Sequence, residues 1–200
     1  MKKKIITIDG PAASGKGRIA RYISRRWKFK HLDSGILYRR IAIKLHESKI
    51  DPKSESKIKK FITKLNVISF RKSKKLRTER ISEIASKIAI YECVRNFINK
   101  IQRNFVNSNL KDQNFVVDGR DIGSVVFKSA NLKLYIDVSE KNRAKRRYKQ
   151  LIDSGEKSIY PQILKDIKLR DKKDKTRINS PLVIPKDAHH INNEGSFKET

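Results

Sequence analysis

The chain has 200 residues, of which 37% are hydrophobic, and this composition suits one globular domain with a lean core. No apolar run approaches the ~18 residues that a membrane span needs, and the apolar stretch at residues 5–8 is too short for a signal peptide. Cys93 is the only cysteine, which excludes an internal disulfide and a cysteine-rich zinc site. We therefore expect a cytoplasmic monomer with no membrane partner, in which Cys93 is a small buried side chain.

The formal net charge is +28, from 49 Lys and Arg against 21 Asp and Glu. A charge of this size attracts polyanions, and nucleic acid is the first partner that it suggests. The lysines are, however, spread along every polar face, and no basic block is interleaved with a recognisable nucleic-acid module. A drift in overall residue usage accounts for this pattern as well as a binding surface does, so we expect no specific nucleic-acid partner.

In the first half of the chain, a buried strand is predicted at residues 4–9 and ends at Gly10. Residues 15–27 follow as a helix, because their apolar side chains recur at four-residue spacing. Further along we expect an extended piece, two helices and a weak strand, in this order: 31–33, 36–47, 55–64 and 66–70.

In the second half, Thr78 is the expected N-cap of a helix whose apolar face includes Ile81 and Ile88. A second helix carries Val94 and Ile101. The remaining predicted elements are two strands and two helices: 115–118, 132–138, 141–151 and 160–173. Strands that alternate with helices through connections too long for hairpins predict an α/β fold with a parallel sheet.

A phosphate-binding loop is predicted where the first strand meets the first helix. Gly10-Pro11-Ala12-Ala13-Ser14-Gly15-Lys16 matches the first seven positions of the Walker A motif. In this motif the backbone N–H groups and a helix N-terminus surround the phosphates, and the lysine reaches the β and γ groups. A glycine turn without a ligand is the alternative, but the position between a strand and a helix favours the loop.

The match stops at Gly17, where the strict motif has a Ser or Thr that holds Mg²⁺. Nucleoside monophosphate kinases commonly have Gly-Lys-Gly-Thr at this point, so Gly17 is itself a point of resemblance to that family. Arg18 takes the place of the threonine. It could add a phosphate-binding cation or crowd the loop, and the sequence leaves both interpretations open.

Four further blocks resemble the bacterial cytidylate kinases, and they occur in the order of that family. They begin at His31-Leu32-Asp33-Ser34-Gly35, Val117-Asp118-Gly119-Arg120-Asp121, Arg143-Ala144-Lys145-Arg146-Arg147 and Ile167-Lys168-Leu169-Arg170-Asp171. Together with the first strand and the phosphate loop, they span residues 4 to about 188. The resemblance implies a three-layer P-loop NTPase fold with a parallel sheet, a short helical NMP-binding insertion and a small lid.

The resemblance also implies the partners, which are ATP, CMP and dCMP, with Mg²⁺ arriving on ATP and water rather than at a protein metal site. The residues implied to bind ATP are Gly10, Pro11, Ala12, Ala13, Ser14, Gly15, Lys16, Gly17, Arg18, Arg146 and Arg147. Those implied to bind CMP are Ser34, Arg39, Ser86, Arg95, Arg120, Asp121, Arg170, Asp174 and Arg177. The catalytic set is Lys16, Arg39, Arg120 and Arg177.

The chemistry of phosphoryl transfer agrees with these sets. The reaction needs two phosphate chains held in line with their charge neutralised, and the planar, permanently charged guanidinium suits that task. By resemblance, Ser34, Arg39, Arg120 and Arg177 hold the CMP phosphate, while Arg170 and Asp174 reach the ribose. Cytosine presents one amino donor beside ring acceptors, so Asp121 is expected to accept from it, and Arg95 and Ser86 to donate.

Several of these residues have simpler interpretations. Arg95, Arg146 and Arg147 could form an exposed basic helix face, and Ser86 could be a surface polar residue. Asp118 is either a Walker-B-like acid or a strand-end cap. The four histidines have no metal-ligand spacing, so we assign them no chemistry.

The chain departs from the family in two places. Only residues 71–75 stand where a longer strand-rich excursion is usual, so the CMP side should be smaller. After Ala188, the polar run 189–193 replaces an apolar strand, and the usual closing helix is absent. We expect the loss of that strand to remove sheet pairing and to lower stability.

The expected organisation is one kinase domain over residues 1–200. Its parts are the core, the NMP-binding insertion, the lid and a C-terminal helix with a tail: 1–45 with 95–151, 46–94, about 152–164, and 165–200. Four functions remain open: an ATP-dependent CMP and dCMP kinase of pyrimidine nucleotide metabolism, a kinase that prefers another acceptor such as UMP, a degenerate nucleotide binder, and a nucleic-acid-binding protein.

Overall fold

The computed structural model describes residues 3–65, 68–70, 73–108, 112–153 and 155–195. Two compact units make up the chain. Unit 1 comprises Met1–His31 and Asp112–Thr200, and unit 2 comprises Leu32–Lys111.

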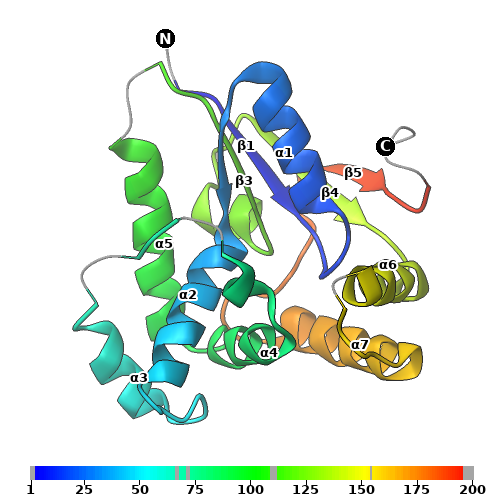
Figure 1. Ribbon diagram of the computed structural model, residues 1–200. Coiled ribbons are helices and arrows are strands. Elements are labelled where there is room, and N and C mark those ends of the chain that lie inside the picture. Colours follow the sequence, from blue (N-terminus) through cyan, green and yellow to red (C-terminus); the bar gives the residue numbers. More distant parts are fainter. Residues whose placement is uncertain (1–2, 66–67, 71–72, 109–111, 154, 196–200) are drawn as a thin grey trace. The chain divides into compact units, whose positions relative to one another are not determined.

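The sheet contains five strands in the order β2-β3-β1-β4-β5 (Figure 1). Its strands are β1 (Ile5–Asp9), β2 (Lys30–Asp33), β3 (Phe115–Gly119), β4 (Leu132–Asp137) and β5 (His189–Asn192). The β1–β3, β1–β4 and β4–β5 pairs are parallel. Strands buried on both faces are mostly apolar, and all five residues of β3 are buried, including Asp118 near its end. The predicted parallel α/β fold is thereby confirmed.

The register sets the position of the functional loops. Asp9, the last residue of β1, pairs with Gly119 at the end of β3 and with Tyr135 in β4. In parallel sheets, the crevice beyond the carboxyl ends of the strands is where ligands bind. The loops that follow β1 and β3 therefore start at the same edge.

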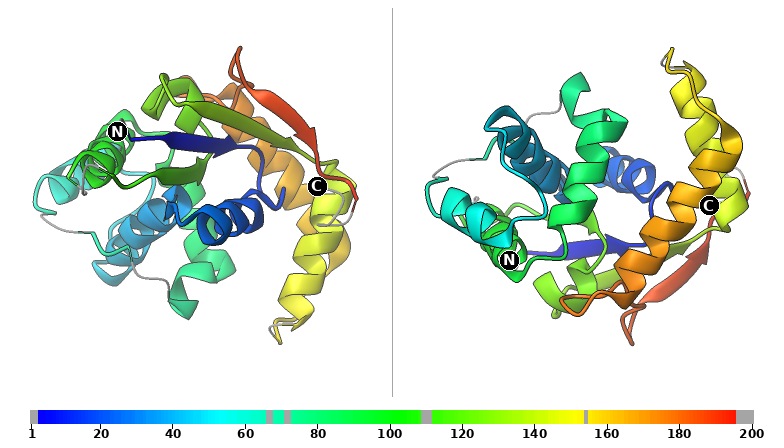
Figure 2. Two further views of the ribbon diagram at one scale, coloured as in Figure 1. Left: turned by 90° about the horizontal axis from the view of Figure 1, so that it is seen from above. Right: turned by 90° about the horizontal axis from the view of Figure 1, so that it is seen from below.

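Three long helices belong to unit 1: α1 (Lys16–Trp27), α6 (Glu140–Asp153) and α7 (Tyr160–Thr176). Ile19 and Ile23 of α1 pack with Ile8 and Val116 of the sheet. Helices α6 and α7 lie side by side in all three ribbon views, with α7 starting from a proline in its first turn (Figures 1 and 2). Their shared core consists of Ala144, Leu151, Ile163 and Ile167.

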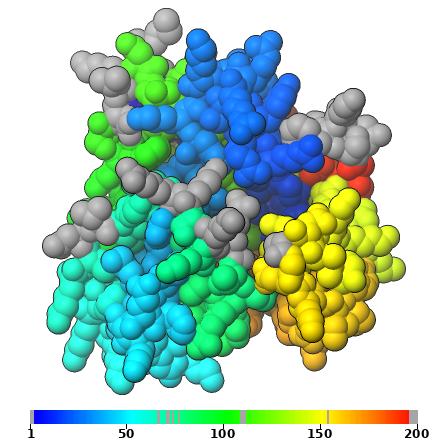
Figure 3. All heavy atoms as spheres, viewed as in Figure 1, coloured from blue at the N-terminus to red at the C-terminus, as the bar shows by residue number. Residues whose placement is uncertain are grey.

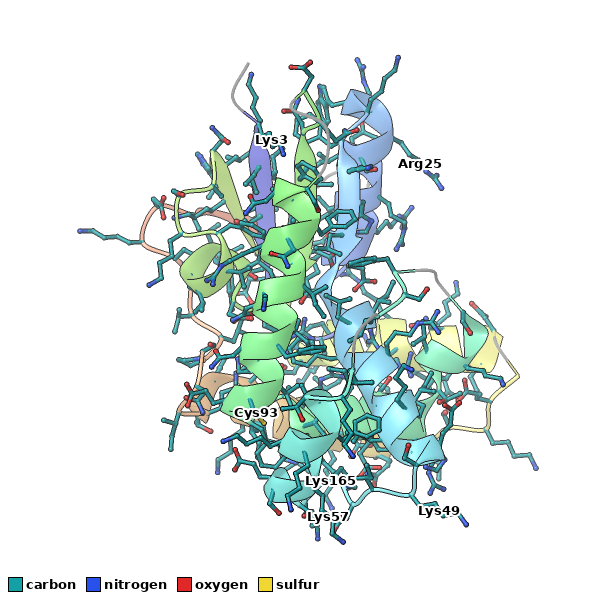
Figure 4. The ribbon with its side chains drawn as sticks, turned by 90° about the vertical axis from the view of Figure 1, so that its left-hand side faces the viewer. Lys3, Arg25, Lys49, Lys57, Cys93 and Lys165 are labelled. Carbon is teal, nitrogen blue, oxygen red and sulfur yellow. The ribbon has the colours of Figure 1, made fainter. Side chains whose placement is uncertain are left out.

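Unit 2 is helical from Ser34 onward and has its own core. Its elements are α2 (Ser34–Glu47), α3 (Glu55–Ile62), the 3₁₀ turn η1 (Lys74–Arg77), α4 (Glu79–Ile88) and α5 (Glu92–Asn107). Its fully buried side chains include Leu37, Leu45, Ile58 and Ile98. In Figure 4, Lys49 and Lys57 extend outward from this unit.

The predicted loss of the C-terminal strand is wrong. Residues 189–192 form β5, which pairs with β4 in parallel, and Asn193 N continues the ladder by donating to Asp137 O at 2.9 Å. A strand at the sheet edge is held by its backbone bonds and needs few apolar side chains. Ile191 contributes to the core, while His189 and His190 remain exposed.

Three smaller expectations also need correction. Of the weak strand expected at 66–70, residues 66 and 67 lie outside the described residues and 68–70 form no strand; Ile68 is buried in the helical core instead. Thr78 precedes α4 as predicted, but its Oγ1 donates to Lys75 O at 3.4 Å and caps no helix N–H. Cys93 is half-buried rather than buried, in the first turn of α5. Within the described residues, no helix has the length and apolar character to cross a membrane.

Candidate active site

The loop between β1 and α1 has the geometry of a phosphate cradle. Gly10 and Gly15 have φ values of 152° and 88°, which an L side chain rarely adopts. A Cβ at Gly10 would lie 2.4 Å from Ile136 O, so only glycine fits against the neighbouring strand. Gly15 precedes the first residue of α1, where backbone N–H groups without helical partners favour an anion.

Lys16 lies folded over this loop. Its Nζ donates to Pro11 O at 2.9 Å, and the side chain is buried. Ser14 is fully buried, and within the described part of the chain its Oγ has no hydrogen-bond partner. Arg18, by contrast, has an exposed side chain, so it does not crowd the loop.

Asp118, at the end of β3, faces the same helix start. Its Oδ2 lies 3.5 Å from the position that a Cβ would take at Gly17, and its Oδ1 lies 2.6 Å from His31 Nε2. The carboxylate is therefore held by a histidine to which the sequence analysis assigned no role. A hydroxyl at position 17 would face this carboxylate, and glycine leaves that space open.

A residue that the sequence analysis missed, Asp9, connects the phosphate loop to the loop after β3. Its two carboxylate oxygens accept hydrogen bonds from Ile122 N at 2.8 Å and Gly123 N at 2.7 Å. The pKa of Asp9 is raised to about 6, chiefly by burial and to a smaller extent by Asp121, against the lowering effect of the two backbone bonds and Lys16. These bonds fix the π-helical turn η2 (Ile122–Val126) directly after Arg120 and Asp121.

Three of the predicted CMP-binding residues meet at Asp174 in α7. Arg120 Nε donates to its Oδ2 at 3.0 Å, and Arg177 Nη1 to its Oδ1 at 3.2 Å. Burial alone would raise the pKa of Asp174, but the guanidinium groups of Arg120, Arg170 and Arg177 together hold it below its usual value. Arg177 Nε also donates to Ser180 O at 2.7 Å, which orients the fork.

The other predicted CMP-binding residues lie in unit 2. Ser34 is buried at the first position of α2, and a Cβ at Gly35 would lie 2.8 Å from Arg39 Nη1, so Arg39 folds back along this turn. Arg95 is 2% exposed, donates from Nη1 to Ala89 O at 2.9 Å and lies over the Tyr38 ring at 5.8 Å. The interpretation of Arg95 as an exposed basic residue is therefore wrong.

Ser86 is half-buried on α4. Its role, like the ligand-binding role of every residue above, stays a prediction.

The basic helix α6 contributes an unpredicted arginine. Arg143 is buried and donates to Val138 O at 2.9 Å, to Ala12 O at 3.3 Å and to Asp171 Oδ2 at 2.5 Å. It therefore ties the phosphate loop to α6 and α7. The sequence analysis recognised the block that contains Arg143. The spacing of the arginines in that block does not show that Arg143 is structural whereas Arg146 and Arg147 are expected to face a ligand.

The two predicted ATP-binding arginines of α6 differ in their contacts. Arg146 Nη2 donates to Asn193 O at 2.7 Å and to Gly195 O at 3.1 Å, and its Nη1 lies 3.9 Å from the Cβ position of Gly15. Arg147 Nη1 donates to Gln150 Oε1 at 3.2 Å on the helix surface. Of these two arginines, Arg146 is the one that these distances place beside the phosphate loop.

A second missed residue, Asn193, closes the loop from the C-terminal side. Its Nδ2 donates to Ser14 O at 2.7 Å and lies 2.6 Å from the Cβ position of Gly15. The two residues are 179 positions apart, so no local pattern could have connected them. The only available signal was the position of Asn193 at the end of the last strand.

The chain resembles known proteins over nearly its whole length. A family model described as cytidylate kinase matches residues 6–198. A cytidylate kinase from Sinorhizobium medicae is 40% identical over 185 residues, covering 92% of this chain and 85% of the relative. Another, from Nitrosomonas europaea, is 39% identical over 201 residues, covering 96% and 88%.

Solved structures resemble the fold. A Thermus thermophilus protein superposes with a TM-score of 0.53 at 16% identity, over 100% of this chain and 93% of its own. An uncharacterised protein from Eubacterium ventriosum gives 0.51 at 12% identity, over 96% and 90%. At these identities the likeness concerns the fold alone.

Proposed function

The chain belongs to the cytidylate kinase family, and on that premise we propose that it transfers the γ-phosphoryl group of ATP to CMP and dCMP, forming CDP and dCDP. It is accordingly a nucleoside monophosphate kinase, a phosphotransferase. The observation that carries the proposal is Asp9, whose carboxylate fastens the start of a phosphate loop to the turn that follows Arg120 and Asp121. One buried group thus sets the spacing between a donor-binding and an acceptor-binding loop.

On the donor side, the N–H groups of residues 12–17 cradle the ATP phosphates, and Lys16 leaves Pro11 O to reach them. Arg146 supplies a further cation near Gly15. Its contacts with the 193–195 backbone support this role because they hold the guanidinium beside the loop. Arg143 is a positioning residue, since each of its three guanidinium nitrogens already donates to the protein.

On the acceptor side, Arg120 and Arg177 bind the CMP phosphate together with Ser34 and Arg39. Asp174 positions the first two arginines and, with Arg170, meets the ribose. The hydrogen bonds that Arg120 and Arg177 donate to the Asp174 carboxylate restrict both guanidinium groups. Less rotational freedom is therefore lost when phosphate binds. Asp121, Arg95 and Ser86 form the cytosine-reading set.

Mg²⁺ would enter with ATP, held mainly by phosphate oxygens and water. No group of three or more metal-ligating side chains occurs within the described residues, and Gly17 offers no hydroxyl. Asp118 Oδ2 and the buried Ser14 Oγ are the oxygens that suit a nucleotide-borne cation at this loop. When bound, the ion neutralises phosphate charge.

The chain's own residues act by positioning and by charge. The guanidinium groups and Lys16 hold the attacking CMP oxygen in line with the γ-phosphorus and neutralise the equatorial oxygens, while the β-phosphate leaves with ADP. Residues 152–164, which join α6 to α7, serve as the lid. Closure of this lid would exclude water from the site, so that transfer to CMP is faster than ATP hydrolysis. The cytoplasm is the expected location of this reaction.

A coupled assay of ADP release with CMP, dCMP, UMP and AMP tests this function. We expect turnover that depends on CMP or dCMP and is clearly slower with UMP and AMP. Lys16→Ala should lower kcat by a factor of ~100 or more, because it removes a charge placed on the transferring phosphates. Lys57→Ala, on the exposed face of α3, is the matched control. Well-folded protein without CMP-dependent turnover would contradict the proposal.

Base selection is tested with Asp121→Asn. The substitution removes the acceptor expected to face the cytosine amino group, so the preference for CMP over UMP should shrink by a factor of ~10 or more. If the ratio of CMP to UMP turnover is unchanged, Asp121 does not read the base. A wild type that turns over UMP faster than CMP would make the kinase that prefers another acceptor the better interpretation.

A further inference from the structure

Helix α1 presents an exposed aromatic and basic surface, here called the α1 outer face: Tyr22, Arg25, Arg26, Trp27 and Lys28. Tyr22 and Trp27 are 51% and 55% exposed, and their rings meet edge to face with centroids 6.3 Å apart. Trp27 is the only tryptophan of the chain. The two rings in contact form a contiguous exposed apolar patch, and such patches mark interaction surfaces more often than single exposed side chains do.

Cations surround these rings without neutralising partners. Arg26 Cζ lies 5.9 Å from the centre of the Trp27 ring, and Figure 4 shows Arg25 extending away from the helix. Among the residues that the structure describes, no carboxylate pairs with Arg25 or Arg26. On α4, by comparison, Lys87 pairs with Glu83 at 2.7 Å.

The local sequence reinforces this charge. Between Asp9 and Asp33 the chain carries seven Lys and Arg and no acidic residue. Figure 3 shows the dark blue side chains of this segment on the visible surface of unit 1. The α1 outer face therefore combines the unpaired positive charge of Arg25 and Arg26 with two exposed aromatic rings.

We propose that the α1 outer face binds single-stranded nucleic acid, a function beyond the kinase activity. Bases stack on Trp27 and Tyr22, and Arg25, Arg26 and Lys28 contact the backbone phosphates. Base faces are available to side chains only where the strand is unpaired, and stacking on aromatic rings is tolerant of sequence. The predicted partner is thus single-stranded RNA or DNA of any sequence.

This surface lies apart from the phosphate loop. Helix α1 has 12 residues, so its Trp27 end is about 18 Å from its Lys16 end. Nucleic-acid binding and nucleotide phosphorylation can therefore be measured separately. Substitutions at positions 25–27 should leave CMP-dependent turnover unchanged.

The first experiment uses Trp27 as its own reporter. Titration with polyuridylate or with poly-deoxythymidylate should quench the tryptophan fluorescence in a saturable manner, because a stacked base contacts the only indole. A duplex of equal length should quench little. Affinity should fall linearly with the logarithm of salt concentration, with a slope of about −0.7 for each phosphate contacted.

The second experiment compares two charge reversals of equal size by anisotropy of labelled polyuridylate. Arg25→Glu with Arg26→Glu should weaken binding roughly tenfold or more and reduce the salt slope by about 1.4. Lys57→Glu with Lys60→Glu, on the exposed face of α3, lowers the net charge equally and should change affinity by less than about twofold. Trp27→Ala should weaken binding, and Trp27→Phe should retain most of it.

Several results would overturn the proposal. If both double variants bind equally, the attraction is diffuse and not located on α1. If RNA binds without quenching Trp27, or if duplex and single strand bind alike, no base stacks there. If RNA does not bind but vesicles of phosphatidylglycerol and phosphatidylcholine shift the Trp27 emission, the surface contacts membranes. Circular dichroism of each variant establishes that it is folded.

Discussion

Asp9 is the residue whose protonation should be visible in the stability of the protein. Its folded pKa of about 6 lies above the ordinary 3.8, because the carboxyl is buried. Between these values the folded state holds the proton that the unfolded chain has lost, so the free energy of unfolding falls as pH rises from about 4 to 6. The full effect is about 3 kcal/mol.

Asp9→Asn removes this titration. We expect the difference in unfolding free energy between the wild type and the variant to decrease across this pH window and to stay constant above it. Urea unfolding at a series of pH values measures it. Asp153→Asn, at the exposed C-terminal end of α6, is the control and should show no such trend. Parallel pH profiles for the wild type and Asp9→Asn would contradict the raised pKa.

Asp174 has the opposite electrostatic character. The three guanidinium groups outweigh its burial and hold the pKa below 3.8, so its charge stabilises the fold above that pH, and the stabilisation is lost as pH falls through the folded value. Asp174→Asn would leave Arg120 and Arg177 less well oriented. Charge-assisted bonds contribute about 1.5–3 kcal/mol, so we expect KM for CMP to rise roughly tenfold or more while KM for ATP changes little.

The control for that measurement is Asp166→Asn. Asp166 lies two turns earlier on α7, is exposed, and accepts a hydrogen bond from Gln162 Nε2 at 2.8 Å. Equal increases in both KM values for Asp174→Asn would indicate a general structural defect and reject the positioning role.

At the scale of elements, β5 shows how a tail strand can stabilise the phosphate loop. The strand delivers Asn193 to Ser14 O and the 193–195 backbone to Arg146. Asn193→Ala removes the bond to the loop, and we expect KM for ATP to rise several-fold, in proportion to a bond of about 1 kcal/mol, with KM for CMP nearly unchanged. Steady-state kinetics with each substrate varied measure the two effects.

Asn192→Ala is the matched control, since Asn192 is exposed and its Oδ1 accepts a local hydrogen bond from Glu194 N at 3.1 Å. If both asparagine variants raise KM for ATP equally, the effect comes from fraying of β5 and not from the contact with the loop.

The elements that sequence predicted well are those with a strong period or a local motif. β1, α1 and the glycine loop are specified within residues 4–27, and the arginines at 120 and 177 stand in blocks with recognisable spacing. β5 was missed because pairing at a sheet edge depends on the backbone, which carries no composition signal. Asp9, Arg143 and Asn193 were missed because their partners lie 113, 131 and 179 positions away.

At the scale of the whole molecule, each unit has its own apolar core. The core of unit 2 is built from α2, α3, α4 and α5, and that of unit 1 from the sheet with α1 and from the α6–α7 pair. The expected boundaries are 46–94 for the insertion and 152–164 for the lid. They follow the functional parts of the family and not the two cores, and they stay predictions. The isoleucine-rich helices alone could not show which of them share a core, because the same apolar spacing serves either unit.

The net charge of +28 should make the whole molecule sensitive to salt. Self-repulsion between like charges destabilises a compact state, and added ions screen it over a distance of about 10 Å at 0.1 M. We expect the midpoint of thermal unfolding, followed by circular dichroism, to rise between low salt and about 0.3 M sodium chloride. Lys57→Glu with Lys60→Glu lowers the charge on an exposed face and should show a smaller rise. A midpoint that falls with salt would mean that attractive pairs such as Arg120–Asp174 and Arg143–Asp171 outweigh the repulsion.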